Sequence, residues 1–145
     1  MEEKLILSGC LLLNKKKEIL LLKRKDHNHY ETPGGKVEVT DIEKEDKKTI
    51  DLQALRKTAE RELKEELGED IEIDYLKFFS NVVFTTPDGS KAVANKFTVN
   101  LIKGEPKLNE PDLFSEIKWI SIKDLETIEL SPDLKLIIPL LKQRF

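Results

Sequence analysis

The sequence predicts an α+β fold in which strands come first, followed by an amphipathic helix, further strands and a last helix. Short apolar runs typical of β-strands lie on both sides of a segment in which apolar residues recur every three or four positions. Strands and helices do not alternate strictly, as they would in a purely parallel sheet. At 145 residues the chain is long enough to bury a core, and we expect a single domain, 1–145.

The first two strands are expected at 4–14 and 18–26, where Leu and Ile dominate and a short lysine-rich turn predicts a hairpin. Cys10, the single cysteine, lies inside the first run and is predicted to be a small buried hydrophobe. The histidines of segment 27–29 are expected in a solvated loop, with a phosphate or base contact as the alternative. Because proline fixes φ and glycine adopts conformations that other residues resist, TPGG at 32–35 predicts a tight loop with exposed backbone.

A helix is predicted from position 52 to the glycine at position 68. Asp51 or Thr49 can cap its N-terminus, and Gly68 stands where a glycine commonly ends a helix. The charged segment 40–51 ahead of it is expected to be a solvated loop, with a lid or a dimer contact as alternatives. The apolar stripe of the helix has members three or four positions apart: Leu52, Leu55, Ala59, Leu63 and Leu67.

The second half predicts three more strands and a final helix. Residues 71–86 and 91–102 are strand-like and flank a PDGS turn, and another strand is expected at 116–121. The final helix is predicted to begin near Ser131-Pro132, with Pro139 kinking or shortening it. The aromatic residues of this half are expected mainly in the core: Phe78, Phe79, Phe84, Phe97 and Trp119.

Charged residues make up 37% of the chain, but both signs are interspersed and the net charge is only -3. This balance gives no reason to expect nucleic acid or an acidic membrane as a partner. No stretch reaches the roughly 18 uninterrupted apolar residues of a membrane span, and the N-terminus has no signal-peptide features. We therefore predict a cytoplasmic protein.

Three glutamates of the predicted helix lie on one of its flanks. On a helical wheel with about 100° per residue and Leu52 at zero, Glu65, Glu62 and Glu66 fall near 220°, 280° and 320°. Arg61 is the adjacent cation on the same helix. Carboxylates on a rigid helix are ligands that hard divalent ions accept, so the flank is either a solvated face or a metal site.

The stretch RELKEELG at 61–68, with Gly35 ahead of it, resembles the Nudix box of the Nudix hydrolases, GX5EX7REUXEEXGU. TPGGKVE resembles the usual entry to that box, and the order of strands and the later Glu110-Pro111 and Trp119 segment resemble MutT-like members. The resemblance implies a Nudix α/β/α sandwich, with a mixed β-sheet between the box helix and a C-terminal helix. It also implies an enzyme that hydrolyses phosphoric anhydride bonds.

The resemblance implies a metal site as well. Glu62, Glu65 and Glu66 would bind Mg²⁺, with Mn²⁺ as the alternative, and the carbonyl oxygen of Gly35 would be a further ligand. Such ions neutralise charge on a pyrophosphate, position it, and lower the pKa of a bound water.

The implied catalytic residues are Glu62, Arg61 and Glu65, and Arg61 would hold the glutamates in place. The general base remains open between Glu62 and Glu110. The residues expected to bind substrate are Gly34, Lys36, Arg24 and Glu110.

The chain departs from the motif at its first glutamate. Gly35 and Arg61 are separated by 25 residues, which is about a dozen more than the motif allows. Counting forward from Gly35 reaches Asp41, and counting back from Arg61 reaches Gln53. The role of the missing glutamate therefore falls to one of these two, and Asp41 is preferred because it is a carboxylate.

The resemblance favours hydrolysis of a nucleoside or deoxynucleoside triphosphate to a monophosphate and pyrophosphate. ADP-ribose or another nucleoside diphosphate sugar is the alternative substrate. A domain that binds a nucleotide without cleaving it is the alternative of a different class. In each case the partner is a small-molecule nucleotide, and a homodimer stays open.

Overall fold

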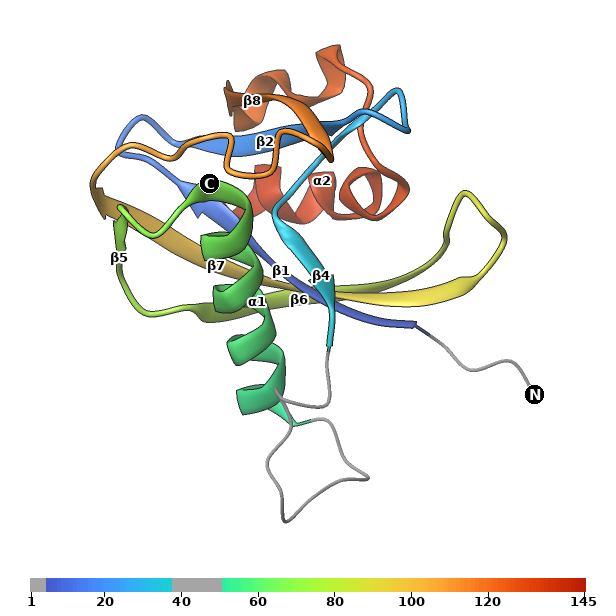
Figure 1. Cartoon of the computed structure of the whole chain (residues 1–145). Helices are drawn as coiled ribbons and strands as arrows, with labels where there is room; N and C mark the ends of the chain where they lie inside the picture. The colour runs from blue at the N-terminus through green and yellow to red at the C-terminus, as the bar shows by residue number, and fades with distance from the viewer. Residues whose placement is uncertain (1–4, 38–50) are drawn as a thin grey trace.

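A computed structural model describes residues 5–37 and 51–145 (Figure 1). The helices are α1 (Leu52–Leu67), the 3-10 helix η2 (Ile122–Thr127) and α2 (Pro132–Arg144). The strands are β1 (Leu5–Leu13), β2 (Glu18–Arg24), β3 (Tyr30–Glu31), β4 (Gly34–Lys36), β5 (Glu72–Ile73), β6 (Lys77–Thr85), β7 (Lys91–Lys103) and β8 (Phe114–Ser121).

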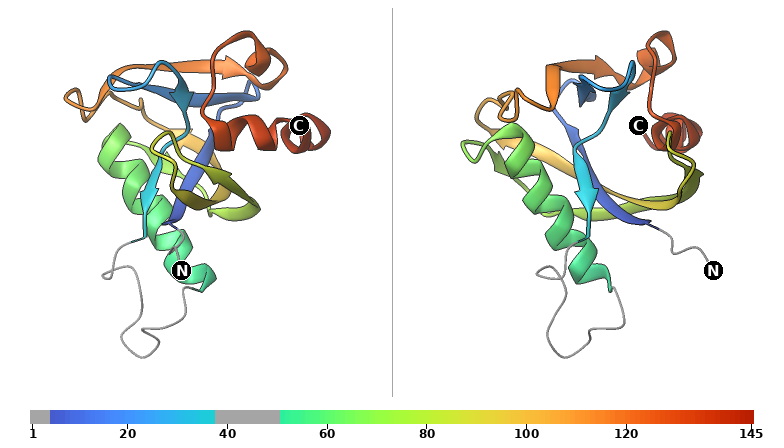
Figure 2. Two further views of the ribbon diagram at one scale, coloured as in Figure 1. Left: turned by 90° about the vertical axis from the view of Figure 1, so that its right-hand side faces the viewer. Right: turned by 45° about the vertical axis from the view of Figure 1, so that its right-hand side comes forward.

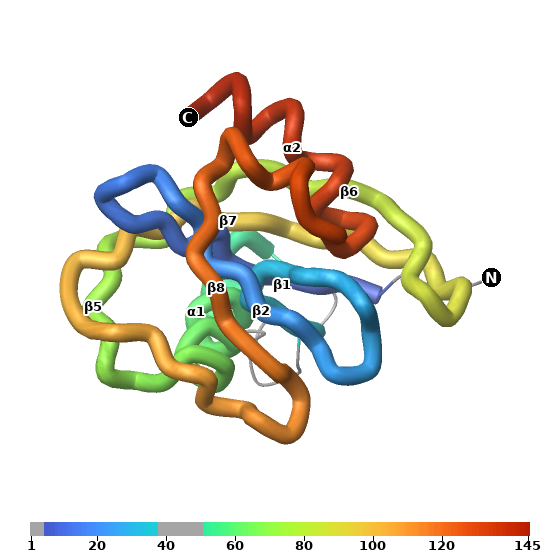
Figure 3. Tube along the Cα trace, turned by 90° about the horizontal axis from the view of Figure 1, so that it is seen from above, coloured from blue at the N-terminus to red at the C-terminus, as the bar shows by residue number. Residues whose placement is uncertain are grey.

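The strands form one mixed sheet, which confirms the predicted fold class. β1 runs parallel to β7 and antiparallel to β2 and β4. β5 and β6 add to β7, and β8 adds to β2, all antiparallel. Because β1 and β2 share a single register pair at Leu13 and Ile19, the β2–β8 ribbon is free to leave the plane of β1 and cross above the remaining strands (Figure 3).

Helices α1 and α2 lie on opposite sides of the sheet (Figure 2). Side chains alternate along β1, so the strand contributes to the cores on both faces of the sheet. Cys10 and Leu12 pack in the core under α1, and Leu11 and Leu13 pack in the core under α2. Cys10 is fully buried, as predicted, and burial raises the pKa of its thiol far above the ordinary value. The sheet is therefore the middle layer of a sandwich.

The predicted helix is confirmed. The side chain of Asp51 accepts a hydrogen bond from the Ala54 N–H at 2.9 Å, and Gly68 ends the helix with φ of 92°. Leu52 does not belong to the buried stripe, because it lies in the first turn and is 46% exposed. Thr49 and the rest of segment 38–50 lie outside the described residues.

Three other predictions need correction. The expected strand at 71–86 is two strands, β5 and β6, and the Asp74 carboxylate accepts hydrogen bonds from the Asn100 backbone and side chain at the break. Pro139 does not shorten α2, which continues to Arg144 with Pro139 on its exposed side. Phe78 is 41% exposed rather than part of the core, whereas Phe97 is fully buried.

The TPGG segment is not the exposed loop that the sequence predicts. Gly34 and Gly35 form β4, where Gly34 pairs with Gly9 of β1 and Gly35 with Ser8. A Cβ atom added to Gly9 would lie 2.2 Å from the Pro33 carbonyl oxygen and 2.9 Å from the Cα of Gly34. These glycines therefore allow two backbones to approach closely, and none of them has a positive φ.

We expect Gly9→Ala to destabilise the fold, because the atoms in its way belong to the backbone and cannot rotate aside. Overpacking of this kind costs about 1–3 kcal/mol, and each kcal/mol lowers the Tm by about 2–4 °C at this size. Gly89→Asn is the matched control, since Gly89 has φ of 91° with open space around it and Asn tolerates that conformation. Thermal unfolding compares the two variants, and an equal Tm would contradict the close-approach argument.

Candidate active site

The site is built where α1 packs on β4 and β1. Gly35 lies directly against Glu62, because a Cβ on this glycine would come within 2.4 Å of Glu62 Oε1. Gly34, its neighbour, donates its backbone N–H to Glu66 Oε2 at 3.3 Å. The structure thus brings both predicted glycines against two of the three predicted glutamates.

Glu66 is a buried carboxyl group in acidic surroundings. Glu66 is only 4% exposed. It lies on the edge of the apolar stripe of α1, as its place on the helical wheel predicts. Burial raises its pKa to about 10, and the nearby charges of Glu62, Glu31 and Glu110 act in the same direction. The Gly34 N–H opposes this rise without overcoming it. At neutral pH the carboxyl is therefore protonated unless a cation joins it.

Arg61 links the remaining carboxylates. Its Nη1 lies 3.1 Å from Glu62 Oε1 and 3.4 Å from Glu65 Oε1, and its Nη2 donates to the Lys36 carbonyl oxygen at 3.3 Å. Burial nonetheless raises the pKa of Glu62, because Arg61 only partly offsets the loss of hydration. The guanidinium thus connects α1 with β4 and orients two glutamates.

The loop after β7 approaches the C-terminal end of α1. Asn109 donates its side-chain amide to the Glu65 carbonyl at 2.9 Å and its backbone N–H to the Glu66 carbonyl at 3.1 Å. Glu110, the next residue, therefore lies close enough for its charge to act on Glu66. Burial raises the pKa of Glu110, and the charge of Glu65 adds to the rise.

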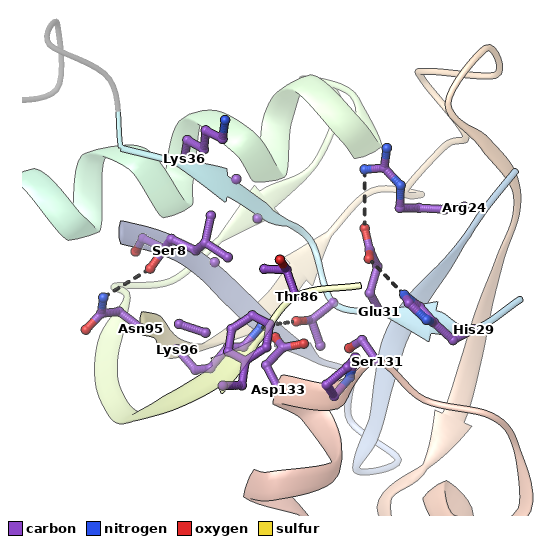
Figure 4. Close-up of a pocket in the computed structure, with 18 of the residues that line it drawn as sticks. Ser8, Arg24, His29, Glu31, Lys36, Thr86, Asn95, Lys96, Ser131 and Asp133 are labelled. Carbon is purple, nitrogen blue, oxygen red and sulfur yellow. Dashed lines mark hydrogen bonds and ion pairs between the residues drawn. The ribbon is translucent and has the colours of Figure 1, made fainter. Parts of the chain in front are cut away.

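A pocket of about 290 Å³ opens on the other side of β4. Figure 4 shows its polar lining, which includes Ser8, Arg24, His29, Glu31, Lys36, Thr86, Asn95, Lys96, Ser131 and Asp133. Of the predicted substrate-binding residues, Arg24, Gly34 and Lys36 line the pocket, as does Gly35. Glu110 is not part of this lining and belongs instead to the carboxylate cluster.

The two histidines lie in the predicted loop, but their side chains are only partly exposed to solvent. Both line the pocket, their rings stack with centroids 5.0 Å apart, and the His29 side chain is only 13% exposed. His29 Nε2 lies 3.6 Å from Glu31 Oε2, and Arg24 Nη1 lies 3.9 Å from the other oxygen of that carboxylate. The approach of His29 to Glu31 of β3 is a contact that the sequence pattern does not reveal.

Comparison with known proteins agrees with this geometry. The NUDIX domain family profile matches residues 6–141, which is most of the predicted domain. The chain belongs to the NUDIX family. No curated protein sequence matches the chain. The prediction of a Nudix hydrolase is thus confirmed at the level of the family.

Solved Nudix structures share the fold. A MutT NUDIX hydrolase from Burkholderia pseudomallei is 24% identical with a TM-score of 0.72, covering 99% of this chain and 100% of that chain. A MutT protein from Methanosarcina mazei is 22% identical with a TM-score of 0.74, covering 98% and 95%. The NUDIX domain of Shewanella oneidensis NrtR, solved with ADP ribose, is 19% identical with a TM-score of 0.75, covering 99% and 90%.

Sequence reasoning missed several residues of this Nudix site. Glu31 and Asn109 carry no recognisable pattern, and Lys96 and Asp133 come together only through the fold. One signal was available for Lys96. It follows Ala92 and Ala94 at alternate positions of a strand, so it places a charge beside two small apolar residues on the same face.

Nudix hydrolases generally use a divalent metal, and the donor chemistry here suits one. Within residues 5–37 and 51–145, no group of three or more His, Cys, Asp or Glu side chains is arranged to hold an ion alone. A hard ion such as Mg²⁺ needs only one or two carboxylates when water and substrate phosphates complete its shell. A buried carboxyl among other carboxyls is a group that such a cation would stabilise. Neither α-helix described here has the length and apolar character needed to cross a bilayer.

The raised pKa of Glu66 predicts a pH-dependent stability in the absence of metal. The folded protein keeps the proton up to about pH 10, whereas the unfolded chain loses it near the ordinary value of 4.5. Between these values the folded state binds more protons, so the free energy of unfolding falls as pH rises. Glu66→Gln removes this loss, and its Tm in EDTA should exceed that of the wild type by a margin that grows from pH 5 to pH 9.

Glu69→Gln is the matched control for this measurement, because Glu69 is exposed just beyond the same helix. Thermal unfolding in EDTA at several pH values compares the three proteins. A Glu66→Gln margin that stays constant with pH would show that the carboxyl is ionised in the folded state.

Proposed function

We propose that the protein hydrolyses a pyrophosphate bond in a nucleoside diphosphate linked to another group, with Mg²⁺ or Mn²⁺ as cofactor. A nucleoside or deoxynucleoside triphosphate, cleaved to a monophosphate and pyrophosphate, is the favoured substrate. One observation carries the proposal: β4 has the carboxylate cluster of α1 on one side and the pocket on the other. The cytoplasmic location stays a prediction from the sequence, and homodimer formation stays open.

In this proposal Glu62, Glu65, Glu66 and the Gly35 carbonyl hold the metal. When bound, the metal neutralises phosphate charge and lowers the pKa of a water molecule. The close contact between Gly35 and Glu62 and the hydrogen bond from Gly34 to Glu66 support this ligand set.

Arg61 acts as a positioning residue, since it contacts Glu62, Glu65 and the backbone of Lys36. The hydrolytic water must lose a proton as it attacks phosphorus. Glu62 and Glu110 are the two candidate acceptors, and the raised pKa of each brings it closer to the neutral range where a general base works best.

Positive charge for the substrate phosphates comes from Arg24 and Lys36, which line the pocket. Arg24 is held by Asp26 at 2.8 Å and lies near Glu31, so its direction is fixed before a substrate arrives. The nucleoside would occupy the rest of the pocket. Its volume of about 290 Å³ suits part of a nucleotide better than a whole dinucleotide.

ADP-ribose is the second candidate substrate, because the Shewanella oneidensis NrtR domain of similar fold was solved with that ligand. A binding domain without hydrolysis is the third. Incubation with Mg²⁺ and a panel of nucleoside triphosphates, ADP-ribose, dinucleoside polyphosphates and sugar nucleotides distinguishes all three by the products formed. Binding without any product would reject the enzyme and favour the binding domain.

Glu65→Gln and Glu66→Gln should each lower turnover while the protein stays folded. Loss of even an outer-shell partner costs about 10–100-fold in metal-dependent activity, and direct ligands should cost at least as much. Glu60→Gln, on the same helix and paired with Lys64, is the control and should keep its activity. Full activity of either test variant would remove that glutamate from the ligand set.

Removal of divalent ions should abolish hydrolysis, and added Mg²⁺ or Mn²⁺ should restore it. Ca²⁺ should restore much less, because it takes more ligands at longer distances than Mg²⁺ does. The assay is product formation from the preferred substrate after treatment with EDTA and dialysis. Undiminished turnover in EDTA would contradict the role of the metal.

A further inference from the structure

The segment that follows β7 is attached to the C-terminal end of α1 (Figure 1). The Lys107 N–H donates to the Leu67 carbonyl at 2.9 Å, and the Asn109 N–H donates to the Glu66 carbonyl at 3.1 Å. The Asn109 side-chain amide donates to the Glu65 carbonyl at 2.9 Å. We call residues 107–109 the helix clamp, because they bind the turn of α1 that carries two of the predicted metal ligands.

The helix clamp completes the hydrogen bonding of the last turn of α1. An α-helix leaves its last four carbonyls without a partner inside the helix. Three of them accept from the clamp, and the fourth, that of Lys64, accepts the Gly68 N–H at 2.9 Å. Asn109 supplies two of the four donors, one from its backbone and one from its side chain. A substitution of Asn109 removes only the side-chain donor, so the role of the amide can be tested separately.

Glu110 follows the helix clamp directly and is held from its other side as well. Its carbonyl accepts the N–H of Leu113 at 3.0 Å and that of Phe114 at 3.1 Å. Phe114 is 3% exposed and packs in the core under α1. The backbone of Glu110 is therefore fixed between α1 and the start of β8.

This position of Glu110 is electrostatically unfavourable without a cation. The charge of Glu110 raises the pKa of Glu66, and the charge of Glu65 raises the pKa of Glu110. The C-terminal end of a helix also disfavours negative charge. Repulsion therefore acts to move Glu110 away from α1, and the hydrogen bonds of the helix clamp oppose that movement.

We infer that Asn109 is a positioning residue that holds the Glu110 carboxylate near Glu65 and Glu66, so that its charge contributes to the binding of the metal ion. The inference rests on the proposed function in one respect, which is that the glutamates of α1 hold the metal. A divalent cation among these carboxylates is attracted by each of them, and the attraction falls with distance. The affinity for the cation should therefore depend on the contact that keeps Glu110 in place.

Simple capping of α1 is the competing explanation. A residue that only satisfies helix carbonyls would stabilise the last turn, and its loss would disturb Glu65 and Glu66 whether or not residue 110 carries a charge. A residue that acts through Glu110 loses its influence on metal binding once that carboxylate is gone. A double-mutant cycle of Asn109 with Glu110 therefore separates the two explanations.

The test is the binding of Mn²⁺ to the protein without substrate, measured by calorimetry, which requires no turnover. Asn109→Leu keeps the size of the side chain and loses the amide, and Asn109 is exposed, so the variant should fold. It should weaken Mn²⁺ binding about twofold to tenfold, the change that corresponds to one hydrogen bond. Glu110→Gln should weaken binding at least as much, and the double variant should bind no more weakly than Glu110→Gln alone.

Lys107→Met is the matched control. It removes an exposed side chain of the helix clamp, which pairs with Asp70 at 2.8 Å, and leaves the backbone N–H that binds α1. This variant should bind Mn²⁺ as the wild type does. Losses in the double variant that equal the product of the two single losses, or an unchanged affinity in Asn109→Leu or in Glu110→Gln, would overturn the inference, as would a wild type that binds no Mn²⁺.

Steady-state kinetics give a second readout. Asn109→Leu should lower kcat and leave the KM for the nucleotide unchanged, because Asn109 is not among the described residues that line the pocket. Hydrolysis of the substrate panel by the wild type is assayed separately. The expected pattern of Mn²⁺ binding without any product would reject the proposed function and keep the inference, whereas product formation with independent losses in the cycle would do the reverse.

Discussion

The close approach of the β1 and β4 backbones, with the Glu62 side chain of α1 against β4, is the constraint on which the rest of the structure depends. β4 is held against β1 by strand pairing and by a hydrogen bond from the Cys10 N–H to the Pro33 carbonyl at 2.9 Å, with no space for a side chain at Gly9 or Gly34. On its other side the Glu62 carboxylate occupies the position that a side chain on Gly35 would take. Because these glycines have no side chains, β1 and β4 can pack closely. For the same reason the carboxylates of α1 lie next to the β4 backbone, which would contact phosphate in the proposed function.

This packing has an electrostatic cost. Glu65 and Glu66 lie in the last turn of α1, where the helix dipole disfavours negative charge, and the buried carboxyl of Glu66 is surrounded by other acids. Arg61 offsets part of the repulsion, and the loop at Asn109 covers the helix carbonyls without adding positive charge near Glu66. A fold that is selected for stability alone would not place three glutamates here. A site that is completed by a cation and a polyphosphate does need three glutamates here. Such a loss of stability at a functional site is common.

The sequence predicts the parts of the structure that depend on local pattern. The helix at 52–67, with its cap at Asp51 and its end at Gly68, follows from spacing and end signals, and so do most strands. The predictions fail where tertiary contact overrides the pattern. TPGG has the composition of a loop, but the pairing of β4 with β1 places its two glycines in a strand. Apolar composition also did not show that Leu52 and Phe78 face solvent, because exposure depends on what packs against each position.

The same division separates the two halves of the candidate site. The carboxylate cluster comes mainly from one octapeptide, so its geometry follows from helix periodicity and can be predicted from the sequence. The polar lining of the pocket includes Thr32, Lys96 and Asp133, which are distant in sequence and meet only through the fold. No pattern within the chain links them. Chains with the same box can therefore have different pockets, so resemblance in the box alone predicts the chemistry but not the nucleotide.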